Sequence, residues 1–213
     1  MRKMLLTGAA AVLGLVTLTP TVTSAHSNDD SSAAKPTLTE ILLSDSAKDD
    51  ANGFDNRPWD YDIVTQAVLL FPDLVAAASD PNTQLTVFLP TDQAFRNLVK
   101  DITGNWVRSE ADVFAAVASL GTDTVKNVLL YHIVPASISY RDARNANGAV
   151  LDTLLPGASI TVSVRGDEHK RVILGDLDTN SRDPKVVAPN VGGEASNGYA
   201  HGINRVLRPI DLP

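Results

Sequence analysis

The 213-residue sequence contains no cysteine. This absence excludes disulfides, thiolate catalysis, zinc sites built from thiolates and the acylated cysteine of a bacterial lipoprotein. The chain must therefore derive its stability from packing. With 44% hydrophobic and 20% charged residues, its composition is that of an ordinary globular protein with one sizeable core.

Signatures of common enzyme classes are also missing. The sequence has no G-x-S-x-G elbow, no H-E-x-x-H, no P-loop and no Rossmann fingerprint. Only His26, His132, His169 and His201 could act as bases. An enzyme would have to combine His132 and His201 with Asp92, as a metal site or an acid–base pair. We keep such an enzyme as the alternative function. For the main function, a binding module, we predict no catalytic residue, no metal and no cofactor.

Long apolar runs are absent after residue 25, so we expect no membrane span beyond the N-terminus. Before that point, Arg2 and Lys3 precede apolar and small residues at 4–18, and small side chains follow at 23–25. This pattern predicts a secretory signal peptide at residues 1–25. We expect the product to be secreted and extracellular, either free, associated with the cell wall or periplasmic.

Charge limits the partners of the mature chain. Removing the signal peptide takes away two of the 18 basic side chains and none of the 25 acidic ones, which leaves a net charge of about −9. Such an acidic protein is a poor candidate for binding nucleic acid or an anionic membrane surface. We predict an extracellular protein or a polysaccharide as the partner.

The chain after the signal peptide is expected to form a lead-in and one domain. Residues 26–36 are polar, and we expect them to be mobile. The domain is expected to span 37–213 and to begin with a helix, because Thr37 and Glu40 have the spacing of a capping box. An acidic insertion near 44–58 offers carboxylates to calcium, but it lacks an EF-hand register.

One short stretch organises the rest of the domain. Residues 86–89 are β-branched, aromatic or apolar, as a buried strand requires, and Pro90 is expected to end that strand. A helix should follow at once, with Thr91 as its N-cap. We expect Phe88 and Phe95 to anchor the core.

Further helices are predicted on both sides of this stretch. Asp60 or Asp62 can cap a helix before it, and Ser109 can cap one after it. Thr122 or Thr124 is expected to cap another short helix.

Beyond these helices the pattern becomes that of β-strands. Apolar and polar residues alternate over 159–164, and 172–174 can pair back across the turn at 165–170. Further strands are expected at 186–188 and 199–207. With most helices in the first half and a run of strands in the second, the sequence predicts an α+β fold.

Three stretches resemble the signatures of the fasciclin domain family. They are TVFLPTDQAF at 86–95, LYHIVP at 130–135 and NGYAHGINRVLRP at 197–209. Because they occur in family order and at family-like spacing, the chain is identified as a member, namely a secreted bacterial protein with one such domain. The resemblance implies a wedge-shaped β-sandwich or sheet flanked by helices, in which the first and last signatures pair.

The resemblance also implies a function as an extracellular binding or adhesion module that recognises a cell surface, a matrix or a polysaccharide. Animal members use the region of Tyr131 and His132 in integrin-mediated adhesion, so this pair is a candidate partner-binding site. As polar tips in an apolar run, the two residues could instead form a hydrogen-bonded core pair. A structural homo-oligomer is a further alternative to a binding module.

A second candidate contact is Arg165-Gly166-Asp167, which matches the adhesive tripeptide read by some integrins. It falls at the tip of a predicted hairpin, where a partner could reach it. Ordinary turn chemistry explains the same residues.

A calcium loop is the remaining alternative. Asp176, Asp178, Asn180 and Asp183 have suitable oxygens, but Ser181 stands where the sharp-turn glycine of an EF-hand belongs.

Overall fold

The computed structural model describes residues 34–46 and 53–210. The predicted signal peptide, the lead-in up to residue 33 and residues 47–52 of the acidic insertion lie outside this part. At the end of the predicted lead-in, the carbonyl of Pro36 accepts a hydrogen bond from the Ser196 amide at 2.8 Å. The described elements are α1 (Leu38–Ser46), α2 (Asp62–Leu69), α3 (Pro72–Ser79), β1 (Leu85–Pro90), α4 (Asp92–Thr103), α5 (Glu110–Ala118), α6 (Thr122–Tyr131), β2 (Ile133–Val134), α7 (Tyr140–Ala143), β3 (Val150–Asp152), β4 (Ser159–Arg165), β5 (Arg171–Gly175), β6 (Val186–Ala188), β7 (Glu194–Ala195) and β8 (Gly198–Ile203).

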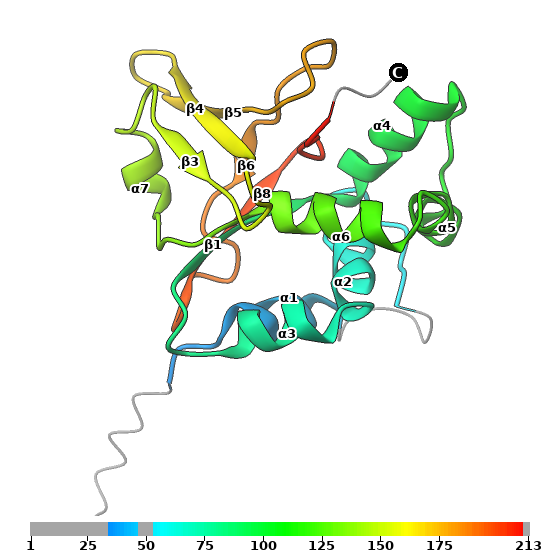
Figure 1. Cartoon of the computed structure of the whole chain (residues 1–213), viewed down its shortest axis with the longest axis horizontal. Helices are drawn as coiled ribbons and strands as arrows, with labels where there is room; N and C mark the ends of the chain where they lie inside the picture. The colour runs from blue at the N-terminus through cyan, green and yellow to red at the C-terminus, as the bar shows by residue number, and fades with distance from the viewer. Residues whose placement is uncertain (1–33, 47–52, 211–213) are drawn as a thin grey trace, which may run out of the picture. The chain divides into compact units, whose positions relative to one another are not determined.

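A mixed sheet forms the centre of this part of the chain (Figure 1). Its strands lie in the order β2-β1-β8-β6, and β7 also pairs with β8. β1 and β8 run parallel, from Leu85 opposite Gly198 to Pro90 opposite Ile203, whereas the other pairs are antiparallel. The first and last signature stretches therefore pair within the sheet, as predicted.

A second sheet, β3-β4-β5, is antiparallel throughout. In β4 the side chains of Ile160 and Val162 are buried and Thr161 between them is exposed, which confirms the predicted alternation. β4 pairs with β5 across the predicted turn, with Val162 opposite Leu174. Two sheets combined with helices make the fold α+β, as the sequence predicts.

β1 lies between two clusters of buried side chains. Leu85, Val87 and Leu89 belong to the cluster that the helices cover, whereas Phe88 belongs to the cluster that includes β4 and β5. Alternate residues of a strand point to opposite faces. Because both faces of β1 are covered, all six of its residues are buried, and its sequence is apolar at nearly every position.

The helix that follows β1 begins and ends as its sequence predicts. The Thr91 hydroxyl accepts a hydrogen bond from the Ala94 amide at 3.3 Å, and Phe95 in the first turn is buried. Gly104 closes the helix in the left-handed conformation, with φ of 74°. Only glycine adopts this conformation without a steric penalty from a β-carbon.

Two other predicted caps are wrong. The N-cap of α2 is Tyr61 and that of α6 is Gly121, and neither makes a side-chain cap hydrogen bond. In α2 the amides of Asp62 and Ile63 bond instead to the carboxylate of Asp92, at 3.3 and 3.0 Å. A side chain from another element therefore replaces the local cap.

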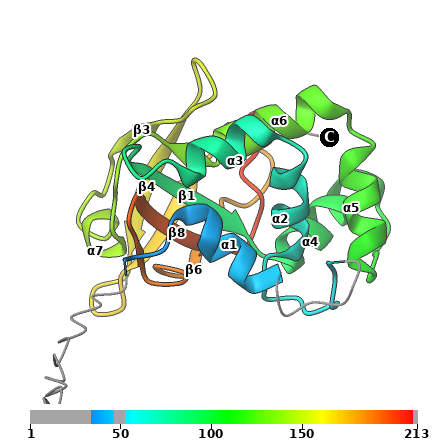
Figure 2. The ribbon, with the colours of Figure 1, turned by 90° about the horizontal axis from the view of Figure 1, so that it is seen from below.

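The first helix, α1, is tied to the C-terminal half of the chain and contacts β8 (Figure 2). Its capping box forms as predicted, since Glu40 accepts from the Thr37 amide at 2.7 Å and Thr37 accepts from the Glu40 amide at 3.3 Å. The fully buried Asn197 accepts from the Leu38 amide at 2.9 Å and donates to the Ala78 carbonyl at 2.8 Å. One side chain thus joins α1, the end of α3 and the turn before β8.

Within residues 34–46 and 53–210, no single helix has the length and apolar character needed to cross a membrane. Two pairs of neighbouring helices pass the same test only together, α2 with α3 and α5 with α6, and they are bent by 107° and 105°.

Candidate functional site

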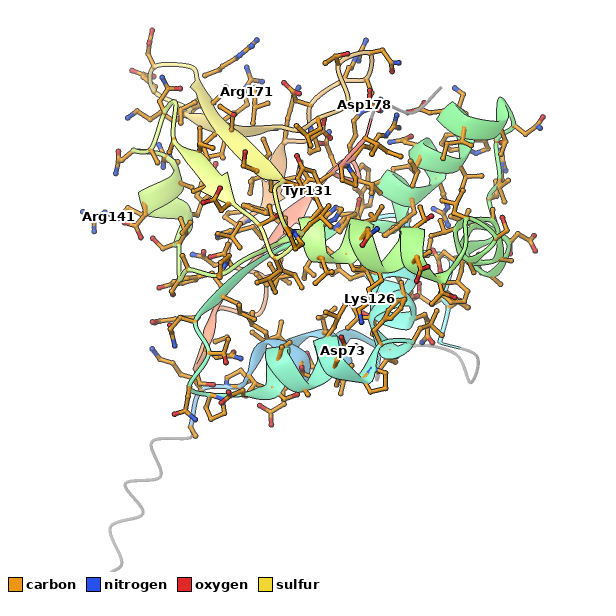
Figure 3. The ribbon with its side chains drawn as sticks, viewed as in Figure 1. Asp73, Lys126, Tyr131, Arg141, Arg171 and Asp178 are labelled. Carbon is orange, nitrogen blue, oxygen red and sulfur yellow. The ribbon has the colours of Figure 1, made fainter. Side chains whose placement is uncertain are left out.

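The Tyr131 and His132 pair is buried, with 0% and 3% of each residue exposed. The Tyr131 hydroxyl donates a hydrogen bond to the Ser159 carbonyl at 2.8 Å. Its ring lies in the interior of the fold, between α6 and the second sheet (Figure 3). His132 Nε2 accepts from the Leu207 amide at 2.9 Å, so Nδ1 carries the proton and donates to the Val128 carbonyl at 2.7 Å. A partner in solvent cannot touch either side chain, and the pair has the geometry of a hydrogen-bonded core.

His201 is held in a similar way. Its Nδ1 accepts from the Asn190 amide at 3.2 Å, and its Nε2 bonds to the Ile138 carbonyl at 2.9 Å. Burial lowers the pKa of His132 to about 4 and also lowers the pKa of His201, so both rings are neutral near pH 7. Because both nitrogens of each ring are engaged with backbone groups, neither histidine offers a free nitrogen to a metal or a substrate.

Asp92, the third residue of the enzyme alternative, lies in a group of carboxylates instead. In the described residues, two sets of acidic side chains have ligand atoms within 4.8 Å of one another, and neither set contains a histidine. One set joins Asp60, Asp92 and Glu110, and the other joins Asp55, Asp62 and Glu110. We call these five residues the carboxylate cluster.

The protein supplies positive charge and hydrogen-bond donors to this cluster. Glu110 is fully buried and pairs with Arg96 at 2.9 Å. Glu110 also accepts from the Asn56 amide at 2.7 Å, while Asn56 Oδ1 accepts from the Glu110 amide at 3.2 Å. With Asp92 bonded to the amides that begin α2, the cluster fastens the loop before α2 to the starts of α2, α4 and α5. Its spacing would suit a hard cation, but these donors already occupy the oxygens of Asp92 and Glu110.

Protonation also keeps the cluster neutral in part. Burial, and next the side-chain hydrogen bond to Asp60, raise the pKa of Asp92 far above its ordinary value. Burial likewise raises the pKa of Asp60 and that of Glu110. Carboxyl groups this close cannot all ionise, so Asp92 holds a proton and donates it to Asp60 near pH 7.

Substituting Asp92 with asparagine should change how stability depends on pH. The folded protein keeps a proton on Asp92 that the unfolded chain, with a pKa of 3.8, releases, so the contribution of Asp92 to wild-type stability should fall as pH rises above about 4. The asparagine side chain would be neutral at every pH and could still accept from the Ile63 amide and donate to Asp60. We expect the stability of Asp92→Asn to fall less than that of wild type between about pH 5 and 9. Urea midpoints across this range measure the difference.

The matched control is Asp123→Asn, which removes one exposed carboxylate from α6. Its stability should follow the wild-type pH curve. If the Asp92→Asn curve also runs parallel to wild type, Asp92 is already ionised in the folded protein.

The predicted calcium loop after β5 is held by an arginine. Asp178, whose side chain is fully buried, pairs with Arg208 at 2.9 Å and accepts from the amides of Asn180 and Ser181, each at 3.1 Å. Asp176 accepts from the Arg208 amide at 2.9 Å. The Arg208 guanidinium thus occupies the position beside Asp178 that a calcium ion would need. The same network of bonds fixes the C-terminal segment to the loop.

Arg165, Gly166 and Asp167 lie at the end of the β4–β5 hairpin. All three are exposed, and Gly166 has φ of 94°, which suits glycine in a tight turn. The tripeptide is therefore accessible, which is what recognition by a partner requires. Its role in binding stays a prediction.

Sequence reasoning missed a basic surface next to this hairpin. A cavity of about 240 Å³ is lined by Arg141, Arg144, Asn145 and Lys170, which we call the basic pocket. The spacing of Arg141 and Arg144 places them on one side of a helical turn and could have indicated part of this surface. The contribution of Lys170 could not be read locally, because the tertiary structure brings the hairpin to α7.

These features define a class of protein: an α+β scaffold whose buried histidines are satisfied internally, and which presents an exposed charged hairpin beside a basic pocket. The model of the Fasciclin domain family matches residues 62–209, which is more than half of the chain. The chain therefore belongs to the fasciclin domain family, whose members include adhesion modules.

The other comparisons are less informative. No curated protein sequence matches the chain. A solved structure of a FAS1 domain pair from the insect cell adhesion molecule fasciclin I is 19% identical, with a TM-score of 0.46. The match covers 68% of this chain and 45% of that structure.

Proposed function

We propose that the mature protein acts outside the cell as a binding module that recognises an extracellular protein or polysaccharide. The observation that carries this proposal is the β4–β5 hairpin, whose tip is exposed at every residue from Arg165 to Lys170. Binding residues are often found on loops that a rigid scaffold positions. Membership in a family with adhesion modules supports the same function.

The hairpin is suited to this role because its base is rigid. Three side chains of its own strands, Val162, Val172 and Leu174, are almost completely buried in the core. The five residue pairs of β4 and β5, from Thr161–Gly175 to Arg165–Arg171, hold the two strands in register. A tip presented by such a base loses little conformational freedom on binding, which favours affinity.

Binding of the purified mature chain to wall polymers, matrix proteins and host cells tests the proposal. We expect saturable binding to at least one of these surfaces. If the Arg165-Gly166-Asp167 tip makes the contact, Asp167→Ala should weaken binding about tenfold or more, because an interfacial charge is lost.

Glu168→Ala is the matched control, because it removes the same charge from the next position of the exposed tip. It should bind like wild type. The absence of saturable binding to any surface would contradict the proposed function, whereas equal losses in both variants would assign the effect to net charge. His132→Ala, by contrast, would report on folding, since that ring is buried.

A further inference from the structure

The basic pocket is a defined place in the fold. α7 supplies Arg141, and Arg144 follows directly as the C-cap of the same helix. The Tyr140 hydroxyl donates to the Lys170 carbonyl at 3.3 Å, which ties the helix to the end of the hairpin. The start of α7 is closed by a capping box between Ser139 and Asp142. The cations around the cavity are therefore carried by backbone that internal hydrogen bonds hold in place.

These cations lack carboxylate partners. In the described part of the chain, Arg141, Arg144 and Lys170 form no ion pair, whereas Arg96 and Arg208 do. The Arg144 guanidinium lies over the Tyr140 ring at 5.8 Å, and its Nε is buried without a hydrogen-bond acceptor. A buried donor without a partner is destabilising.

The acidic groups of the same two elements offset this charge only in part: hydrogen bonds from Ser139 lower the pKa of Asp142 most, and the charge of Arg141 lowers it further. Asp142 accepts from the amide and hydroxyl of Ser139 at 3.2 and 2.6 Å, as part of the capping box. Asp167 and Glu168 are exposed at the hairpin tip and form no ion pair with the lysine or arginines of the described residues. Other cations of the described residues, such as Lys100 and Arg108, also form no ion pair, so the pocket is distinguished by three cations around one cavity in a chain of net charge −7.

Positive charge continues along the hairpin beyond the pocket. Arg165 and Arg171 lie directly opposite each other in the antiparallel pair of β4 and β5. Like charges in this position are destabilising unless something screens them. Figure 3 shows Arg171 on the outer side of the hairpin and Arg141 on the outer side of α7, apart from each other. A ligand with several anionic groups could contact both places, whereas a single small anion could fill only one.

We propose that the basic pocket and the adjoining hairpin arginines bind an acidic polysaccharide, with its carboxylate or sulfate groups facing Arg141, Arg144 and Lys170. This inference rests on the proposed function and names the chemistry of one partner. Arginine suits such a ligand because its planar guanidinium binds carboxylate and related anions through two parallel hydrogen bonds. The acidic remainder of the protein disfavours nucleic acid, whose duplex carries about one charge per 1.7 Å.

The test measures binding to three immobilised polymers: polygalacturonate as the carboxylate source, dextran sulfate as the sulfate source and neutral dextran. We expect the full mature chain to bind at least one acidic polymer and not neutral dextran. Affinity should fall as salt rises from about 50 to 200 mM, because binding releases counterions from the polymer. The acidic polymer that binds more tightly identifies the anionic group.

The decisive variant is the double substitution Arg141→Gln with Lys170→Gln, because both side chains are exposed and their loss should not disturb packing. We expect affinity for the acidic polymer to fall about tenfold and its salt dependence to become shallower. Adding Arg144→Gln should weaken binding further. Circular dichroism of each variant verifies that it is folded.

The matched control is Lys100→Gln with Arg108→Gln, which changes the same charge at exposed positions. These lie near the α4–α5 connection, on the other side of the described part from α7 in Figures 1 and 2. The control should keep affinity within about twofold of wild type. Equal losses in the two double variants, undiminished binding of Arg141→Gln with Lys170→Gln, or equal binding of neutral dextran would overturn the inference.

The two proposals can fail separately. If wild type binds cells or matrix protein but neither acidic polymer, the polysaccharide inference is wrong and the binding module remains. Asp167→Ala adds a second distinction: it should not weaken polysaccharide binding, because it removes a negative charge beside the basic surface. Binding to no surface at all would remove both proposals.

Discussion

Gly198→Ala is expected to prevent formation of the native fold, with a destabilisation of more than about 4 kcal/mol. Gly198 begins β8 opposite Leu85 and has φ of 137°, a conformation that side chains disfavour. A β-carbon here would overlap the Leu85 carbonyl oxygen and lie 2.8 Å from its carbonyl carbon. The obstacle is the backbone of the paired strand, so no side-chain rotation relieves it. Soluble yield and urea unfolding measure the effect.

Gly193→Ala separates the backbone conformation from the steric overlap. Gly193 also has positive φ, at 90°, but an added β-carbon would meet no atom within 4 Å. That variant should fold and lose about 1 to 2 kcal/mol. If Gly198→Ala is no less stable than Gly193→Ala, then β1 and β8 do not approach as closely as this register requires.

Phe88→Ala and Phe95→Ala should each destabilise the protein by about 3 to 5 kcal/mol. Phe88 is 2% exposed between the two sheets, and Phe95 is 3% exposed among the helices. Phe95 already borders an apolar pocket of about 30 Å³, so its loss would enlarge a space that the surrounding helices do not fill. Urea denaturation gives the free energy of unfolding for each variant.

Phe114→Ala is the control, because Phe114 loses the same atoms from a half-buried position on α5 beside Phe54. It should cost clearly less than the other two, since less apolar surface is removed from a buried site. A loss below about 1 kcal/mol for Phe88→Ala or Phe95→Ala would mean that these rings do not anchor the two clusters.

Local chemistry explains where prediction from the sequence succeeded. The Thr91 cap, the Thr37 and Glu40 capping box and the alternation in β4 each depend on residues within a few positions of one another. The pairing of β1 with β8 joins distant segments, and it was expected from the family resemblance. These features together establish an α+β fasciclin fold.

The candidate site depended on contacts that sequence spacing does not reveal. Tyr131 and His132 could have faced a partner or the core, and only the second sheet and the C-terminal segment decide that they are buried. Asp92 lies in the first turn of α4, and its carboxylate bonds to amides about 30 positions earlier in the chain. Its partner was missed because a local cap for α2 was expected from Asp60 or Asp62.

The family could be predicted from three signature stretches, and the α+β class and the central strand and helix from periodicity, caps and turns, because all of these are short-range properties of the chain. Which polar groups are buried, and which charges lie close together, depends instead on how distant elements pack. The tertiary structure places Lys170 beside Arg141 and Arg144, and it surrounds both histidines with backbone groups. Burial and electrostatic environment arise when distant elements pack, so no window of sequence contains them.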